Sequence, residues 1–260
     1  TAKTTPVDAD EVGLIDSAAS NVLKKLTWSN IKATLKSYFD SVTTTLTNKT
    51  LSSPLFTGTL DGWVSAGETW TYASATTFTI SGDKTSKYQK GDKIKLTQTS
   101  VKYFYIIGVS YSSPNTTITV TGGSDYSLAN ATITSPFYSK ADNPQGFPHI
   151  FSYTPTLTAG SGTLTTTSAT GSFCINGNLT YIQATITITD KGTATGSLYF
   201  TIPVNNSSSI PILVGRENAL TGKMLQGAYF SPDKFLILDY MNNSIITNGY
   251  LLRISGTYPI

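Results

Sequence analysis

The polar and aromatic residues best suited to molecular recognition lie in the last quarter of the chain. The run Asp239-Tyr-Met-Asn-Asn-Ser244 combines a carboxylate, an aromatic ring and two amides, and Arg216 and Glu217 add two opposite charges. Aromatic faces and precisely placed polar groups suit sugar binding. We therefore take as candidate receptor-binding residues Arg216, Glu217, Asp239, Tyr240, Asn242 and Asn243. The alternative is that Tyr240 and Arg216 pack or form a salt bridge between copies of the chain.

Residues that could carry catalysis are few. The chain has one histidine, His149, and one cysteine, Cys174, so neither a histidine–cysteine zinc set nor an intrachain disulfide can form. The Gly-Xaa-Ser-Xaa-Gly nucleophile motif and the phosphate-loop and dinucleotide fingerprints are absent. Scattered carboxylates could still meet as a glycan-cleaving pair, which leaves a depolymerase as an alternative. The stacked repeat usual in such enzymes is missing, and we predict no enzymatic activity and no cofactor.

The composition argues against several classes of partner. Asp8, Asp10 and Glu11 lack the glycine and terminal glutamate of a calcium loop, so we predict no metal site. Charged residues make up 13% of the chain, about half the usual share, and the formal net charge is only +3. This balance suits an extracellular or virion-borne protein and does not suggest nucleic-acid binding. No apolar run approaches 18 residues, so we expect no membrane insertion.

One stretch, residues 28–46, has apolar residues at helical spacing. The stripe advances by three, four, three and four positions through Trp28, Ile31, Leu35, Tyr38 and Val42. Such a seam normally packs against other helices, and a lone helix of this length is marginal in water. The rest of the chain has no second helical pattern, and the bulky residues suit three strands better than two. We predict a trimeric helical collar; the alternative is a helix lying on its own β-domain.

The segments around this helix are expected to be extended or hairpin-like. Residues 1–11 form a proline-containing lead-in, and two short apolar runs within residues 12–26 flank a polar turn, as in a hairpin. Thr27 or Ser29 can cap the helix, which should end between residues 42 and 46. Residues 48–62 contain Pro54 and two glycines and read as a connector. Residues 1–62 therefore constitute the N-terminal part.

Segments on both sides of the helix resemble known proteins. Residues 3–10 (Lys-Thr-Thr-Pro-Val-Asp-Ala-Asp), 14–35 and 46–58 are similar to segments of tail-fibre and other minor structural proteins of tailed bacteriophages. Elements at residues 215–217, 222–227 and 249–258 resemble the carboxy-terminal domain of phage fibres less closely. The resemblance implies an elongated homotrimer on the virion, bound at its N-terminal end to other virion proteins.

The remaining sequence predicts β-structure throughout. Short alternating or apolar runs separated by turn residues divide residues 63–140, as in a small barrel or sandwich. Residues 140–148 contain two prolines and a glycine and mark the best domain boundary. Eight strands are expected in residues 141–260, which suggests a jelly-roll-like sandwich. The predicted fold class is mainly β, with a hairpin and one amphipathic helix ahead of two β-domains.

Together these observations predict a homotrimeric fibre protein that attaches to a bacterial surface glycan or protein. Uncharged strands would leave adhesive sheet edges in a monomer, and trimerisation could cover them. The alternative is an architectural head fibre, collar or baseplate spike without receptor binding. In either case the expected location is the virion, outside the cell.

Overall fold

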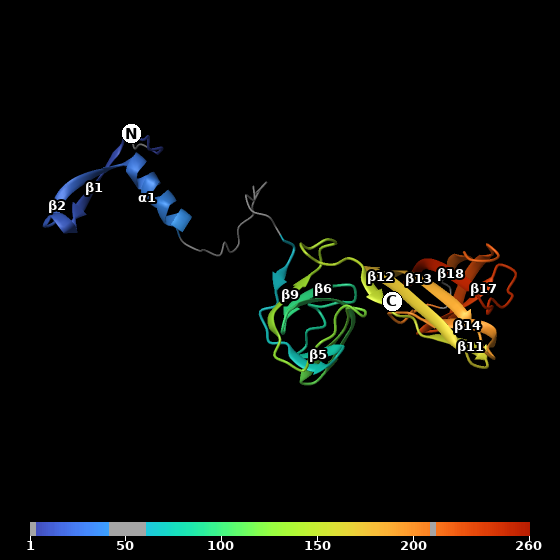
Figure 1. Cartoon of the computed structure of the whole chain (residues 1–260). Coiled ribbons are helices and arrows are strands. Elements are labelled where there is room, and N and C mark those ends of the chain that lie inside the picture. Colours follow the sequence, from blue (N-terminus) through green and yellow to red (C-terminus); the bar gives the residue numbers. More distant parts are fainter. Residues whose placement is uncertain (1–3, 42–60, 209–211) are drawn as a thin grey trace. The chain divides into compact units, whose positions relative to one another are not determined.

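The computed structural model describes residues 4–41, 61–208 and 212–260 (Figure 1). The chain divides into two compact units, residues 1–58 and 59–260, which are described separately. Strands account for 52% and helix for 7% of the structure. The predicted mainly-β fold class is therefore confirmed.

The first unit begins with the predicted hairpin. Strands β1 (Glu11–Asp16) and β2 (Val22–Thr27) pair antiparallel, joined by the short 3-10 turn η1 (Ser17–Ala19). The Asp16 side chain accepts the backbone N–H of Ala18 at 3.0 Å and begins this turn. A two-stranded hairpin is marginally stable by itself, so this unit needs further contacts.

Helix α1 (Trp28–Ser41) follows β2 directly. The Thr27 hydroxyl accepts the backbone N–H of Asn30 at 3.2 Å, which confirms Thr27 as the cap. Lys36 and Asp40, one helical turn apart, form an ion pair. The predicted end of the helix between residues 42 and 46 lies outside the described residues.

The predicted seam on α1 is only partly covered by the described residues of its own unit. Trp28 and Ile31 are half-buried, whereas Leu35 is 51% and Tyr38 59% exposed. Val42, the fifth predicted seam residue, lies outside the described residues. No residue in the range 4–41 is buried. The described part of this unit therefore has no hydrophobic core of its own.

The hairpin of β1 and β2 also exposes apolar side chains. Its exposed large apolar side chains are Val12, Leu14, Ile15, Val22 and Leu23. The register places Ile15 and Leu23 on one face of the hairpin and Val12, Leu14 and Val22 on the other, so both faces expose apolar side chains.

The second unit contains two antiparallel sheets. The first sheet has the order β3-β9-β6-β7-β8-β5-β4. Its strands are β3 (Val64–Ser65), β4 (Thr71–Ser74), β5 (Thr77–Ser81), β6 (Lys93–Thr97), β7 (Val101–Ser112), β8 (Asn115–Thr121) and β9 (Thr134–Ser139). Alternate residues of β5 and β8 are buried, as their period-two pattern requires. In the core, Trp70 stacks on Phe78 with ring centroids 4.4 Å apart.

The second sheet has nine strands and curls into a half-barrel. Its strands are β10 (Phe151–Tyr153), β11 (Leu157–Ser161), β12 (Thr166–Asn176), β13 (Leu179–Asp190), β14 (Thr195–Thr201), β15 (Ile212–Glu217), β16 (Met224–Ser231), β17 (Lys234–Asp239) and β18 (Tyr250–Pro259). All eight strands predicted for this region are present, and β11 is additional. Hydrogen bonds join the nine strands into one sheet, so the jelly-roll-like arrangement stays a prediction.

The strand order places two neighbours in sequence at opposite edges of this sheet. The order is β10-β12-β13-β18-β15-β16-β17-β14-β11, so the edge strands β10 and β11 are separated only by residues 154–156. Edge β10 is three residues long and edge β11 carries a register shift at Ala159. Short and irregular edges discourage pairing with other chains. Part of the protection against edge-to-edge pairing with other chains therefore comes from the fold of a single chain.

The two sheets share buried contacts. Phe147, in the segment predicted as a boundary, is buried, and its ring centroid lies 5.0 Å from that of Tyr105. The Tyr105 hydroxyl donates to the His149 carbonyl oxygen at 3.0 Å. The Ser124 backbone N–H donates to the Ser152 carbonyl oxygen at 2.8 Å. These contacts join both sheets within one compact unit.

We expect Gly123→Ala to weaken this junction strongly. Gly123 has φ +60°, and a Cβ there would lie 2.0 Å from the Ser152 carbonyl oxygen. Backbone strain and overpacking together should lower the free energy of unfolding by about 2 to 4 kcal/mol, measured by urea denaturation. The control is Gly82→Ala, where φ is +80° but nothing lies within 4 Å of the added Cβ. Equal losses in both variants would show that the close approach contributes nothing.

Candidate functional site

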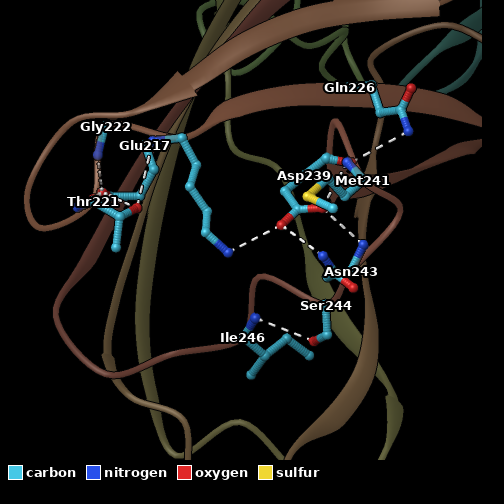
Figure 2. Close-up of polar contacts among 10 residues, drawn as sticks. Glu217, Thr221, Gly222, Gln226, Asp239, Met241, Asn243, Ser244 and Ile246 are labelled. Carbon is cyan, nitrogen blue, oxygen red and sulfur yellow. Dashed lines mark hydrogen bonds and ion pairs between the residues drawn. The ribbon is translucent and has the colours of Figure 1, made fainter.

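The six candidate receptor-binding residues come together at one end of the nine-stranded sheet. Strand β15 ends at Glu217 and β17 ends at Asp239, and Asp239 pairs with Leu225 at the start of β16. The Tyr240 backbone N–H donates to the Met224 carbonyl oxygen at 3.2 Å. Residues 218–224 and 240–243 therefore form one continuous surface, which we call the loop platform (Figure 2).

Glu217 organises the first loop of the platform from within. Its side chain is fully buried, and its carboxylate accepts backbone N–H groups from Ala219 at 2.6 Å, Thr221 at 2.5 Å and Gly222 at 3.1 Å. The Leu220 N–H and the Thr221 hydroxyl also donate to it. Burial opposes ionisation, but these hydrogen bonds outweigh it and lower the pKa of Glu217 to about 2. Glu217 is therefore an ionised anchor for the loop.

Asp239 organises the second loop of the platform, residues 240–243, from within. It is buried, and it accepts the backbone N–H groups of Met241 at 2.9 Å and Asn243 at 2.8 Å. The Lys223 ammonium donates to Asp239 Oδ2 at 3.0 Å and so ties the first loop to the second (Figure 2). The Asn243 backbone hydrogen bond, against a smaller effect of burial and with help from Lys223, lowers the pKa of Asp239 to about 2.

The other four predicted residues face solvent. Arg216, Asn242 and Asn243 are exposed, and Tyr240 is 67% exposed. The Asn242 side-chain oxygen accepts a hydrogen bond from Gln226 Nε2 at 2.5 Å, with Asn242 at φ +64°. These residues are available for contact, whereas the Glu217 and Asp239 carboxylates are occupied by their own loops. We therefore assign Glu217 and Asp239 a supporting role.

The platform also presents apolar side chains that the sequence reasoning did not select. Leu220 is 65%, Met224 56% and Met241 64% exposed, and with Tyr240 they make an apolar surface on a polar frame. The sequence does contain a signal for them, because they are large apolar residues within polar, turn-forming loops. Exposed aromatic and methionine side chains on a rigid support are typical of contact surfaces.

This arrangement offers binding and no general acid or base. Both platform carboxylates are held ionised by several donors, so neither is free to exchange a proton near neutral pH. His149 lies elsewhere, exposed, with its Nε2 2.6 Å from Asn143 Oδ1. Cys174 is half-buried on β12, and burial raises the pKa of its thiol.

Searches of the structure and of known proteins add the following findings. Within residues 4–41, 61–208 and 212–260, no group of three or more histidine, cysteine, aspartate or glutamate residues could hold a metal ion. The helix of the described chain is neither long nor apolar enough to cross a membrane. Neither protein-family models, nor curated proteins, nor solved structures give a match to this chain.

Proposed function

We propose that the chain is a homotrimeric fibre protein of a bacteriophage virion that attaches through the loop platform to a bacterial surface glycan or protein. The observation that carries this proposal is the rigid exposure of Tyr240 and Met241 above the buried Asp239 carboxylate. A surface ordered before binding loses less entropy when a partner is bound. Low charge and the resemblance of residues 3–58 to phage fibre segments support a virion location outside the cell.

The uncovered apolar surface of the first unit supports the trimer. None of the residues 4–41 is buried; on the helix stripe, Trp28 and Ile31 are half-buried, whereas Leu35 and Tyr38 stay exposed. Three copies of α1 packed along this stripe would form the trimeric collar, with the N-terminal end joined to other virion proteins. The C-terminal sheet, in its proposed jelly-roll-like arrangement, would lie at the receptor-binding end.

The second candidate function is architectural: a head fibre, collar or baseplate spike without receptor binding. The buried junction between the two sheets, around Phe147 and Tyr105, favours it because a stiff spacer needs such a junction. Gold labelling of the protein on intact virions separates the two functions. A label at the tail would support the attachment function, and a label confined to the capsid would favour the architectural head fibre.

Adsorption to whole bacteria tests the attachment function. Fluorescent full-length protein is incubated with a panel of strains that differ in capsule and cell-wall polymer, and we expect saturable binding to a subset. Tyr240→Ala should weaken that binding about tenfold, because exposed aromatic anchors often contribute more than 1 kcal/mol. The control is Tyr111→Ala, which removes an exposed tyrosine on β7. Equal binding by both variants, or a folded trimer that binds no strain, would overturn the proposal.

A further inference from the structure

The chain contains only two arginines, and they are direct neighbours. Arg216 on β15 pairs with Arg253 on β18 in the antiparallel ladder. Directly opposed residues point to the same face of a sheet, and both arginines are exposed, on the face opposite to the buried Glu217 and Leu252. Like charges placed opposite each other are destabilising. The fold therefore holds two positive charges together at a cost.

Nothing in the described residues neutralises this pair. Neither guanidinium has a hydrogen-bond or ion-pair partner among residues 4–41, 61–208 and 212–260. The nearest carboxylate in sequence, Glu217, is buried and fully engaged by the amides of its own loop. Lys223, by contrast, is paired with Asp239. The two arginines are thus free to meet an external anion.

Arg253 also lines a groove on the exposed face of the sheet. The groove has a volume of about 470 Å³ and crosses β12, β13, β18 and β15. One wall carries Thr170, Thr185 and Arg253, the other Ser172, Gln183, Ser255 and Val214. None of its lining residues is acidic. Gln183 Nε2 donates to the Ser172 hydroxyl at 2.8 Å, which orients the amide within the groove.

Arg216 joins this groove to the loop platform. It lines a second hollow of about 370 Å³ together with residues 217–220 and 222. A Cβ added to Gly222 would lie 3.1 Å from Arg216 Nη2, so the guanidinium lies beside the platform loop. The arginine pair therefore stands between a polar groove and a partly apolar platform.

We propose that the arginine pair and the groove bind an acidic segment of a surface glycan, with its carboxylate or phosphate group held between Arg216 and Arg253. The guanidinium fork matches the oxygens of either anion, and the hydroxyl and amide groups of Thr185, Gln183 and Ser255 suit sugar hydroxyls. Two adjacent positive charges, one of them lining an otherwise uncharged groove, fit one anionic group per segment. A nucleic acid would require many more cationic contacts. This inference rests on the proposed function and names its ligand class.

Calorimetric titration of the full-length chain tests the ligand class. The probes are an oligogalacturonate, its methyl ester as the uncharged match, and a glycerol-phosphate oligomer. We expect the acidic probes to bind, more weakly as salt rises, and the ester to bind at least tenfold more weakly. Binding of only one acidic probe supports the site and identifies carboxylate or phosphate. Equal binding of acid and ester, or binding of no acidic probe at millimolar concentration, overturns the proposal.

Single substitutions test whether the acidic probes bind at the arginine pair. Arg253→Gln and Arg216→Gln should each weaken acidic-probe binding about tenfold or more, as expected for loss of a charge-assisted hydrogen bond. Because each relieves the repulsion within the pair, Tm should not fall below that of the unsubstituted protein. Lys191→Gln removes a positive charge from the turn after β13, outside the groove, and should leave binding unchanged. Weakening by Lys191→Gln equal to that by Arg253→Gln would reduce the effect to net charge and overturn the site.

The test of the acidic-glycan site can fail independently of the test of the attachment function. Cell adsorption that persists in the double arginine variant overturns the glycan-acid site and leaves attachment through the platform standing. Binding of acidic oligosaccharides without adsorption to any strain supports the site and counts against attachment.

Discussion

Replacing Ile31 and Leu35 together by aspartate is expected to dissociate the proposed trimer. Both residues lie on the apolar stripe of α1, and Leu35 is 51% exposed within a single chain. In a three-helix collar the double substitution would place six carboxylates in an apolar seam, at a cost of several kcal/mol for each one that stays charged. Light scattering should then report the mass of one 27.8-kDa chain in place of three times that mass.

The matched control is Ala33→Asp. Ala33 lies on the opposite side of the helix, where an added charge meets solvent, so the trimer should persist. A double variant that keeps three times the chain mass would show that the stripe is packed elsewhere. A monomeric unsubstituted protein would contradict the trimer itself.

Glu217→Gln is expected to lower the free energy of unfolding of the second unit by about 3 kcal/mol, because it leaves buried amides facing a neutral group with fewer acceptor sites. Five donors from residues 219–222 point at this carboxylate within 3.1 Å. Asp142→Asn, which removes one exposed negative charge from the same unit, should change that free energy by less than about 0.5 kcal/mol. Similar losses in the two variants would deny Glu217 its anchoring role.

A comparison of the unsubstituted protein with Glu217→Gln at different pH values tests the lowered pKa of Glu217. Glu217 has a pKa of about 2 in the folded chain, below its ordinary value of about 4.3 in the unfolded chain. Its contribution is therefore fully present above the unfolded pKa and is lost as pH falls through the folded pKa. The Tm difference between the unsubstituted protein and Glu217→Gln should narrow from pH 5 to pH 2. A constant difference over that range would contradict the lowered pKa.

Local sequence patterns were sufficient to find most elements of the fold. Alternation located β13 and β18, and helical spacing located α1, because in each case one face is buried or built to be buried. The missed strands lack that signal. β3 has two residues, β4 has four, β9 contains Pro136, and β11 contains Gly160. Such strands exist because a neighbouring strand pairs with them.

The hydrophobic periodicity of the sequence could not predict the order of the strands in the sheet. No local feature of residues 151–161 indicates that β10 and β11 stand at opposite edges of one curled sheet. That arrangement depends on pairings between distant segments, such as Leu179 with Pro259. The trimeric collar and the jelly-roll-like arrangement stay predictions for the same reason, since both depend on contacts between surfaces.

The structure brings the six candidate residues together at one end of the sheet, but it buries two of them and exposes the other four. Chain position made Glu217 and Asp239 look like exposed loop residues, whereas both carboxylates are buried. A signal was present: each is followed within two to five residues by small or polar residues whose N–H groups can turn back toward it. The pairing of Arg216 with Arg253 could not be read from sequence, because the two lie on strands β15 and β18 joined through a hairpin and a long loop.

The position of β18 has a consequence for biosynthesis. This strand is the last in the described chain, yet it lies between β13 and β15 inside the nine-stranded sheet (Figure 1). During translation, β13 can pair with β12 as it leaves the ribosome, but its other neighbour is missing until residues 250–259 have been made. The hairpin and helix of residues 11–41 depend only on short-range contacts and can form much earlier. Nascent chains of the proposed trimer would thus associate through their helices while the second unit is still unfolded, so the proposed collar would select partners before the proposed receptor-binding surface exists.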